Sequence, residues 1–331
     1  MKAPDFWWDN HRNLSSLTLM PLSWVYQAGI ALKRKLGPVP KRMSVPVICV
    51  GNVTIGGSGK TPIALDIATR LKLMGKTPHF LTRGYGGNLA THTKVENGYH
   101  SPVEVGDEAL LLSRVATTWI GSNRATTAHM ALDFGADVLI MDDGFQNYSL
   151  AKDLSFLVFD GGVGKGNNRL LPAGPLREPF DTAISRADGL IMIGEDNTSL
   201  LPYVPASLPK LTANIRPEID EAKIKGRRFL AFAGIGRPTK FFDTLEALGA
   251  ILVETRSFPD HYSYCISDIT SLKNAAASLR ATLITTDKDA VRLKPQEKDD
   301  INVLKISIHW DDKTVIEALL ISLFDKVRDA S

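Results

Sequence analysis

The glycine-rich stretch GNVTIGGSGKTP, residues 51–62, constrains the fold of this chain more than any other feature. The apolar, β-rich run VPVICV comes directly before it. After it, apolar residues recur at the spacing of one helical face, at Ile63, Ala64, Ile67, Ala68 and Leu71. The sequence therefore predicts a strand, a tight glycine loop and an amphipathic helix in succession, which is a typical unit of an α/β fold.

The loop ends in Gly-Lys-Thr, the Walker A arrangement, in which backbone N–H groups converge on phosphate oxygens. In this pattern the lysine, here Lys60, reaches the β- and γ-phosphates of a nucleotide. The hydroxyl, here Thr61, holds Mg²⁺, and the positive end of the following helix adds to the attraction. Thr54 stands where the pattern has its first glycine. The residues predicted to bind the nucleotide are Thr54, Gly56, Gly57, Ser58, Gly59, Lys60 and Thr61.

Short apolar runs alternate with helical patterns along the rest of the chain, which predicts a mostly parallel sheet covered by helices on both faces. Further strands are predicted at His79–Thr82, Thr117–Ile120, Val138–Met141, Phe156–Phe159 and Leu190–Ile193. Helices are predicted near Asp107–Val115 and Arg124–Phe134.

A second, smaller α/β series follows the proline-rich stretch LLPYVPASLPK, residues 200–210. Its predicted elements are RRFLAFAGIG, a helix near Lys240–Leu248, ILVETRSF, a helix near Ser267–Leu279, and ATLITTD. We therefore predict a larger domain at residues 43–215 and a smaller one at residues 216–331.

Two adjacent carboxylates end the apolar run ADVLIMDDGFQ, at Asp142 and Asp143. The carboxyl ends of parallel strands form the edge at which open α/β sheets bind ligands. One of the two acids is expected to hold a hydrated Mg²⁺, as the Walker B aspartate does, and the sequence does not rank one above the other.

Composition argues against several other classes of protein. A net charge of +3 is too small to indicate a nucleic-acid partner. Cys49 and Cys265 are the only cysteines, so there is neither a disulfide framework nor a cysteine metal site. This usage fits a reducing cytosol.

The N-terminal segment, residues 1–42, predicts contact with a membrane. No charged residue occurs from Leu14 to Leu32, and aromatic residues precede this stretch at Phe6, Trp7 and Trp8. Five basic residues follow it: Lys33, Arg34, Lys35, Lys41 and Arg42. Their position predicts that the rest of the chain lies on the cytoplasmic side of the membrane. A signal peptide is disfavoured because the basic cluster follows the apolar stretch. A helix that spans the bilayer, one that lies in its interface and one packed on the protein all stay open.

Several motifs taken together resemble one family, the tetraacyldisaccharide 4'-kinases. Besides the glycine-rich loop and MDDGFQ, they are LTRGYGG, VGDEALLL, RLLPAGPLREP, FAGIGRP, FPDHY and TTDKDAVRL. They run in order from Gly51 to Leu293. Thr54 is no departure there, because the family's loop also lacks the first glycine.

The resemblance implies a reaction and a place for it. The γ-phosphoryl group of MgATP would move to the 4'-hydroxyl of an acylated glucosamine disaccharide 1-phosphate, the precursor of lipid A. This acceptor has four acyl chains and stays in the bacterial inner membrane, so the enzyme would work at the cytoplasmic face of that membrane among its lipids. No protein partner and no nucleic acid are implied.

The resemblance also implies roles for residues outside the loop. Lys60 and Asp107 would be catalytic, Asp107 as the proton acceptor assisted by His261, with Glu108 ordering the metal or the base. Asp260 would orient His261. The arginines of the motifs would bind the substrate's phosphate or the nucleotide: Arg83, Arg169 and Arg177. Judged by residue chemistry alone, each of these could instead be an ordinary surface or helix-end residue. Lys288 has no assigned chemistry.

Two rival functions fit parts of the sequence. A membrane-bound GTPase or ATPase switch would use the same loop, but the stretch TDKDA lacks the asparagine of a guanine-reading element and has Ala290 at its last position. A soluble kinase of small metabolites would use the N-terminal helix only for packing. Retention on membranes and the choice of acceptor distinguish these functions.

Overall fold

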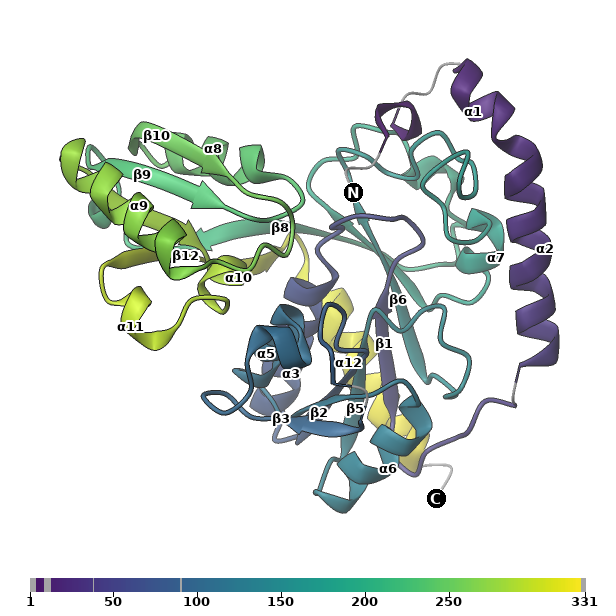
Figure 1. Ribbon diagram of the computed structural model, residues 1–331. Helices are drawn as coiled ribbons and strands as arrows, with labels where there is room; N and C mark the ends of the chain where they lie inside the picture. Colours follow the sequence, from purple (N-terminus) through teal and green to yellow (C-terminus); the bar gives the residue numbers. More distant parts are fainter. Residues whose placement is uncertain (1–3, 9–12, 38, 90, 329–331) are drawn as a thin grey trace.

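The computed structural model describes residues 4–8, 13–37, 39–89 and 91–328 (Figure 1). Within them, 12 strands form one continuous sheet in the order β10-β9-β11-β12-β8-β7-β6-β1-β5-β2-β4-β3. The strands are β1 (Val47–Gly51), β2 (Pro78–Thr82), β3 (Thr93–Val95), β4 (Thr118–Ile120), β5 (Val138–Asp142), β6 (Leu154–Asp160), β7 (Gly189–Ile193), β8 (Lys210–Glu218), β9 (Arg228–Ala233), β10 (Ile251–Ser257), β11 (Thr282–Thr286) and β12 (Ile301–Trp310).

Helices cover both faces of this sheet. The longer ones are α3 (Lys60–Leu73), α6 (Arg124–Asp133), α8 (Pro238–Ala247), α9 (Ile266–Ser278) and α12 (Lys313–Arg328). The shorter ones are α4 (Pro102–Val105), α5 (Asp107–Ser113), α7 (Phe180–Ile184), α10 (Asp287–Ala290), α11 (Pro295–Lys298), η2 (Leu201–Tyr203) and η3 (Glu221–Lys223).

The larger half of the sheet, strands β1–β8, is parallel except for the pair β3–β4. Its central strands are apolar runs buried on both faces, as expected for a covered parallel sheet. One core lies between the sheet and helices α3 and α12. The other lies on the side of α6 and α7. The predicted mostly parallel α/β sheet is confirmed.

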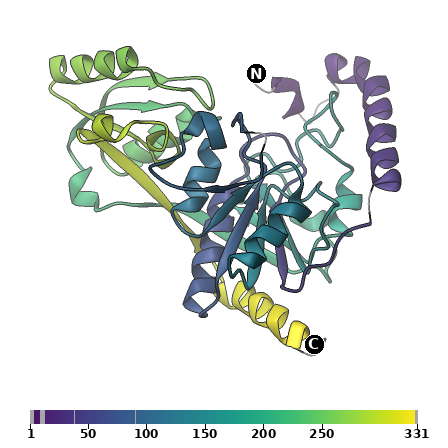
Figure 2. The same ribbon diagram turned by 60° about the horizontal axis from the view of Figure 1, so that its bottom comes forward.

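The smaller half, strands β9–β12, joins the larger one through the antiparallel pair β8–β12, in which Ile215 is opposite Ile308. Helix α8 packs on one face of this half and α9 on the other. After β12 the chain returns to the larger half as α12 (Figure 2). There Ile316, Leu320 and Leu323 are buried with residues of α3.

The predicted boundary at residue 216 falls inside β8, and the sheet continues across it. The division into residues 43–215 and 216–331 stays a prediction, and residues 90 and 329–331 lie outside the described residues. Elements from β8 onward that the sequence did not predict are β8 itself, η3, α10, α11, β12 and α12. The predicted helix ends differ by a few residues; for example, α5 ends at Ser113 instead of Val115.

The N-terminal segment forms η1 (Asp5–Trp7), α1 (Leu14–Thr18) and α2 (Met20–Leu36). The uncharged stretch is therefore divided at Leu19 and does not form one helix. Among the described residues, no helix has the length and apolar character needed to cross a bilayer. Helix α2 lies along the outside of the molecule, beyond α7 (Figure 1). Residues 1–3, 9–12 and 38 of the predicted segment 1–42 lie outside the described residues.

Candidate functional site

The phosphate loop, residues 51–61, leaves the carboxyl end of β1 and enters α3. Gly59 precedes α3 with a left-handed φ of 81°, and Gly56 has a φ of 113°. Asn52 is fully buried and braces the loop, because its Nδ2 donates to Ser58 Oγ at 2.9 Å. Thr54 is buried and forms a bridge with Leu176. Glycine and buried polar residues therefore hold the loop in one shape at the start of α3.

Gly59→Ala is expected to destabilise the protein by about 1 kcal/mol from backbone strain alone, and by more because the new Cβ would collide with the Ile193 side chain. Gly75→Ala is the matched control at the other end of α3: its φ is 75°, but no atom lies within 4 Å of the added Cβ. Thermal unfolding and nucleotide binding measure both effects. Equal losses in the two variants would show that the packing of Gly59 on Ile193 does not matter.

The two acids after β5 have different surroundings. Asp142 is buried, and its Oδ2 accepts from Thr61 Oγ1 at 3.0 Å. Burial, and then the negative charge of Glu108, raise the pKa of Asp142 to about 7. Asp143 accepts from Arg177 Nη1 at 3.2 Å and lies 3.5 Å from Lys60 Nζ. Burial would raise the pKa of Asp143, but these two cations outweigh it and lower the pKa.

The residues beside Thr61 fit a magnesium ion. Asp142 Oδ1 is buried and has no hydrogen-bond partner among the described residues, so one carboxylate oxygen next to a hydroxyl is free to bind a cation. Among all the residues that the structure describes, there is no group of three or more His, Cys, Asp or Glu side chains that could hold a metal ion by itself. The protein would thus supply only part of the ligand shell, as is usual where Mg²⁺ binds together with phosphates and water.

Asp107 and His261, far apart in the sequence, lie in contact. Asp107 begins α5 and is 4% exposed, and His261 follows β10 with a positive φ of 59°. His261 Nδ1 lies 3.0 and 3.1 Å from the two carboxylate oxygens of Asp107. Burial would raise the pKa of Asp107, but the hydrogen bond from His261 and the charges of Lys288 and Arg292 hold that pKa well below its usual range.

Two cations of the TTDKDAVRL motif complete this cluster. Lys288 Nζ pairs with Glu108 Oε1 at 3.3 Å and lies 3.9 Å from Asp260. Arg292 is buried and binds Asp107. The sequence motif contains Lys288 but indicates no role for it, and Arg292 was not predicted, because only the tertiary fold brings that arginine to Asp107. Glu108, predicted near the metal, is paired with Lys288 while its charge still acts on Asp142.

The three arginines predicted to bind substrate lie in different surroundings. Arg177 faces Asp143 beside the phosphate loop. Arg169 Nη1 donates to Ser16 Oγ of α1 at 2.9 Å, so it binds the N-terminal segment. Arg83 is exposed after β2, and its charge acts on the buried Arg124. Their separate positions place only Arg177 beside the phosphate loop.

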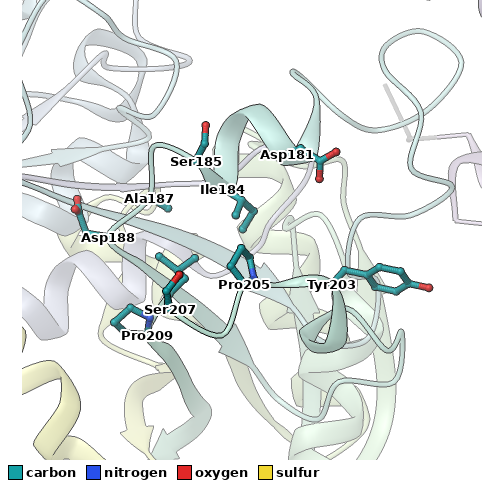
Figure 3. Close-up of a pocket in the computed structure, with 10 residues that line it drawn as sticks. Asp181, Ile184, Ser185, Ala187, Asp188, Tyr203, Pro205, Ser207 and Pro209 are labelled. Carbon is teal, nitrogen blue, oxygen red and sulfur yellow. The ribbon is translucent and has the colours of Figure 1, made fainter.

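An open hollow of about 510 Å³ lies elsewhere, between α7 and residues 203–209 (Figure 3). Asp181, Ile184 and Tyr203 are among its lining residues. None of the predicted site residues lines it. The charged groups that suit phosphate chemistry surround the phosphate loop instead, so the candidate site is the loop with its neighbouring acids.

A phosphate loop on a mostly parallel sheet, with a buried acid beside Thr61 and an Asp–His pair nearby, defines a P-loop phosphotransferase. The family described as Tetraacyldisaccharide-1-P 4'-kinase matches residues 15–324. The chain belongs to this family.

Similar proteins cover almost the whole chain. The tetraacyldisaccharide 4'-kinase of Paramagnetospirillum magneticum is 47% identical over 329 residues, 99% of each chain. That of Rhodospirillum rubrum is 44% identical over 325 residues, 97% of each chain. A crystal structure of LpxK from Aquifex aeolicus in complex with ATP has a TM-score of 0.79 and 29% identity, and covers 94% of this chain and all of that one.

Proposed function

We propose that this protein transfers the γ-phosphoryl group of ATP to the 4'-hydroxyl of a tetraacylated glucosamine disaccharide 1-phosphate, a step of lipid A biosynthesis. Its family and the names of its relatives support this acceptor. The ATP bound in the Aquifex aeolicus structure supports the donor. The observation that carries the proposal is that α5, which begins at Asp107, packs beside α3, which begins at Lys60 (Figure 1).

At the nucleotide end, this chain supplies positive charge and fixed hydrogen-bond donors. Lys60 neutralises oxygens of the β- and γ-phosphates, while backbone N–H groups of the loop and the N-terminus of α3 bind the phosphates. Arg177 adds a second cation beside Asp143. Thr61 and Asp142 would hold Mg²⁺, which would supply further neutralisation of the phosphate charge.

At the acceptor end, Asp107 and His261 together take the proton of the attacking hydroxyl. An ionised carboxylate can only accept hydrogen bonds, so Asp107 fixes the His261 tautomer that carries its hydrogen on Nδ1. The lone pair is then on Nε2, which can receive a proton. Burial of Asp107 keeps the carboxylate from rotating freely in solvent.

The N-terminal segment supports work at the cytoplasmic face of the inner membrane. Two of its polar side chains face the protein: Ser16 Oγ donates to Ala173 O at 2.5 Å, and Ser23 Oγ donates to Leu170 O at 2.9 Å. Apolar side chains face outward instead, with Trp24 62% exposed and Val25 70% exposed. Three basic residues end α2. Such a helix suits the interface of an anionic bilayer.

The double variant Trp24→Gln/Val25→Gln is expected to bind vesicles containing anionic phospholipid at least about tenfold more weakly, because each buried apolar side chain contributes about 1.5–3 kcal/mol. Leu73→Gln, which removes an exposed apolar side chain at the end of α3, is the control. Vesicle flotation measures the bound fraction. Unchanged binding of the double variant would contradict an interfacial role for α2.

The proposed reaction is tested with γ-labelled ATP, magnesium and the lipid disaccharide 1-phosphate in detergent micelles. We expect one labelled phosphate on each lipid and little ATP consumption without the lipid. Equal transfer to water-soluble sugars would support a kinase of small metabolites instead. Hydrolysis at the same rate without any acceptor would support an ATPase switch, and either result contradicts the proposal.

A further inference from the structure

Arg292, which lies just beyond α10 in the smaller half, is held by hydrogen bonds on every side of its guanidinium group. Its side chain is 3% exposed. Nε donates to Asp107 Oδ2 at 2.9 Å, and Nη2 donates to the same oxygen. Nη1 donates to Gly234 O at 2.6 Å and to Asp289 Oδ1 at 2.9 Å. An arginine bound this completely has one orientation.

Asp289 anchors this arginine within the smaller half. It is fully buried, and its Oδ1 also accepts from Gly234 N at 2.9 Å and from the Tyr264 hydroxyl at 2.8 Å. Its Oδ2 accepts from Thr286 Oγ1 at 2.6 Å. Because these donors come from the loop after β9, the segment before α9 and the end of β11, the position of Arg292 is set by the whole smaller half.

Asp107 belongs to the larger half, yet its side-chain partners among the described residues come from the other half. They are Arg292 and His261. Its own half supplies the backbone N–H of Glu108, at 2.9 Å from Oδ1. A buried carboxylate needs such partners, since desolvating an unpaired charge is costly. The fork of Arg292 on Oδ2 therefore decides how the carboxylate faces His261.

We propose that Arg292 is a positioning residue for phosphoryl transfer, which acts by fixing the Asp107 carboxylate against His261 Nδ1. This inference rests on the proposed function. In this role Arg292 does not have to contact ATP or the lipid acceptor. It links the assembly of the Asp107–His261 pair to contact between the two halves of the sheet, because Asp289 fixes the arginine on one side of that contact.

If Arg292 only helped to hold the two halves of the sheet together, the loss of another ion pair between the halves should lower kcat by a similar factor. Arg114 and Asp287 form another ion pair between α5 and α10, at 2.6 Å, and both side chains are about one-third exposed. This pair joins the same two segments of the chain, residues 107–114 and 287–292, without touching Asp107. Arg114→Met is therefore the matched control for the loss of an ion pair between the halves.

The test compares Arg292→Met, Arg292→Lys and Arg114→Met beside the wild-type protein. We expect Arg292→Met to lower kcat about a hundredfold, with the KM for ATP changed less than about twofold. Arg292→Lys should recover part of kcat because it restores the charge but not the fork. Arg114→Met should keep kcat within about twofold of wild type.

A double-mutant cycle with Asp107→Asn isolates the mechanism. If Arg292 acts through Asp107, Arg292→Lys should lower kcat in the wild-type background and have little further effect beside Asp107→Asn. This arm does not depend on Arg292→Met being folded, since lysine keeps a cation among the buried acids. Unchanged kcat in Arg292→Lys and Arg292→Met, additive effects in the cycle, or an equal loss in Arg114→Met would overturn the inference. Absence of product from the wild-type protein would instead contradict the proposed function.

Discussion

Lys60→Met is expected to lower kcat by a factor of about a hundred to a thousand, the usual effect of removing one donor that stabilises charge in a transition state. Lys60 begins α3, its side chain is 13% exposed, and its ammonium group lies 3.5 Å from Asp143. Methionine keeps the length of the side chain and removes the charge. The loss should therefore come from phosphate neutralisation and not from packing.

Steady-state kinetics with ATP and the lipid acceptor measure this effect, and the melting temperature checks the fold. Lys72→Met is the control on the same helix, because Lys72 is exposed and donates to Val115 O at 3.0 Å near the far end of α3. We expect wild-type kinetics from the control. A kcat for Lys60→Met within tenfold of wild type would show that the loop does not act on the transferred phosphate.

Asp107→Asn is expected to lower kcat by a factor of about a hundred to ten thousand, the range of general acid–base contributions, while the affinity for ATP stays near wild type. An asparagine at this position can no longer carry the negative charge that faces His261 Nδ1 and Arg292. His261→Gln should give a loss of similar size. The double variant should be little worse than either single one, because the two side chains act as a unit.

The control for this pair is Asp287→Asn, which removes a carboxylate from the partly exposed ion pair with Arg114 and leaves Asp107 intact. Single-turnover experiments with the nucleotide already bound separate chemistry from ATP binding. If Asp107→Asn and His261→Gln both turned over at nearly the wild-type rate, the pair would have no part in proton transfer.

The phosphate loop and its surroundings could be predicted because their signals are local. The glycines, Lys60 and Thr61 are adjacent in the sequence, and the apolar run that ends in Asp142 indicates a buried strand by itself. The contact between Asp107 and His261 followed from a resemblance between motifs and not from spacing, since 154 positions separate them.

Other features depend on tertiary packing and left no local signal. Arg292 looks like an ordinary charge after a short helix until the fold brings it to Asp107. Strands β8 and β12 alternate buried and exposed positions irregularly, which hid the antiparallel pair that joins the two halves. The uncharged N-terminal stretch suggested one continuous helix, but the structure divides it at Leu19.

The central claim is that Lys60 and the Asp107–His261 pair act on one phosphate and one sugar hydroxyl. It is tested most directly with two acceptors, the lipid disaccharide 1-phosphate and the same molecule without its 4'-oxygen, each given γ-labelled ATP and magnesium. We predict that the first gains one labelled phosphate, located at the 4'-position by NMR, with one ADP released per transfer, and that the second gains none. Label on the 4'-deoxy acceptor, or equal ADP release with either molecule, would contradict the claim.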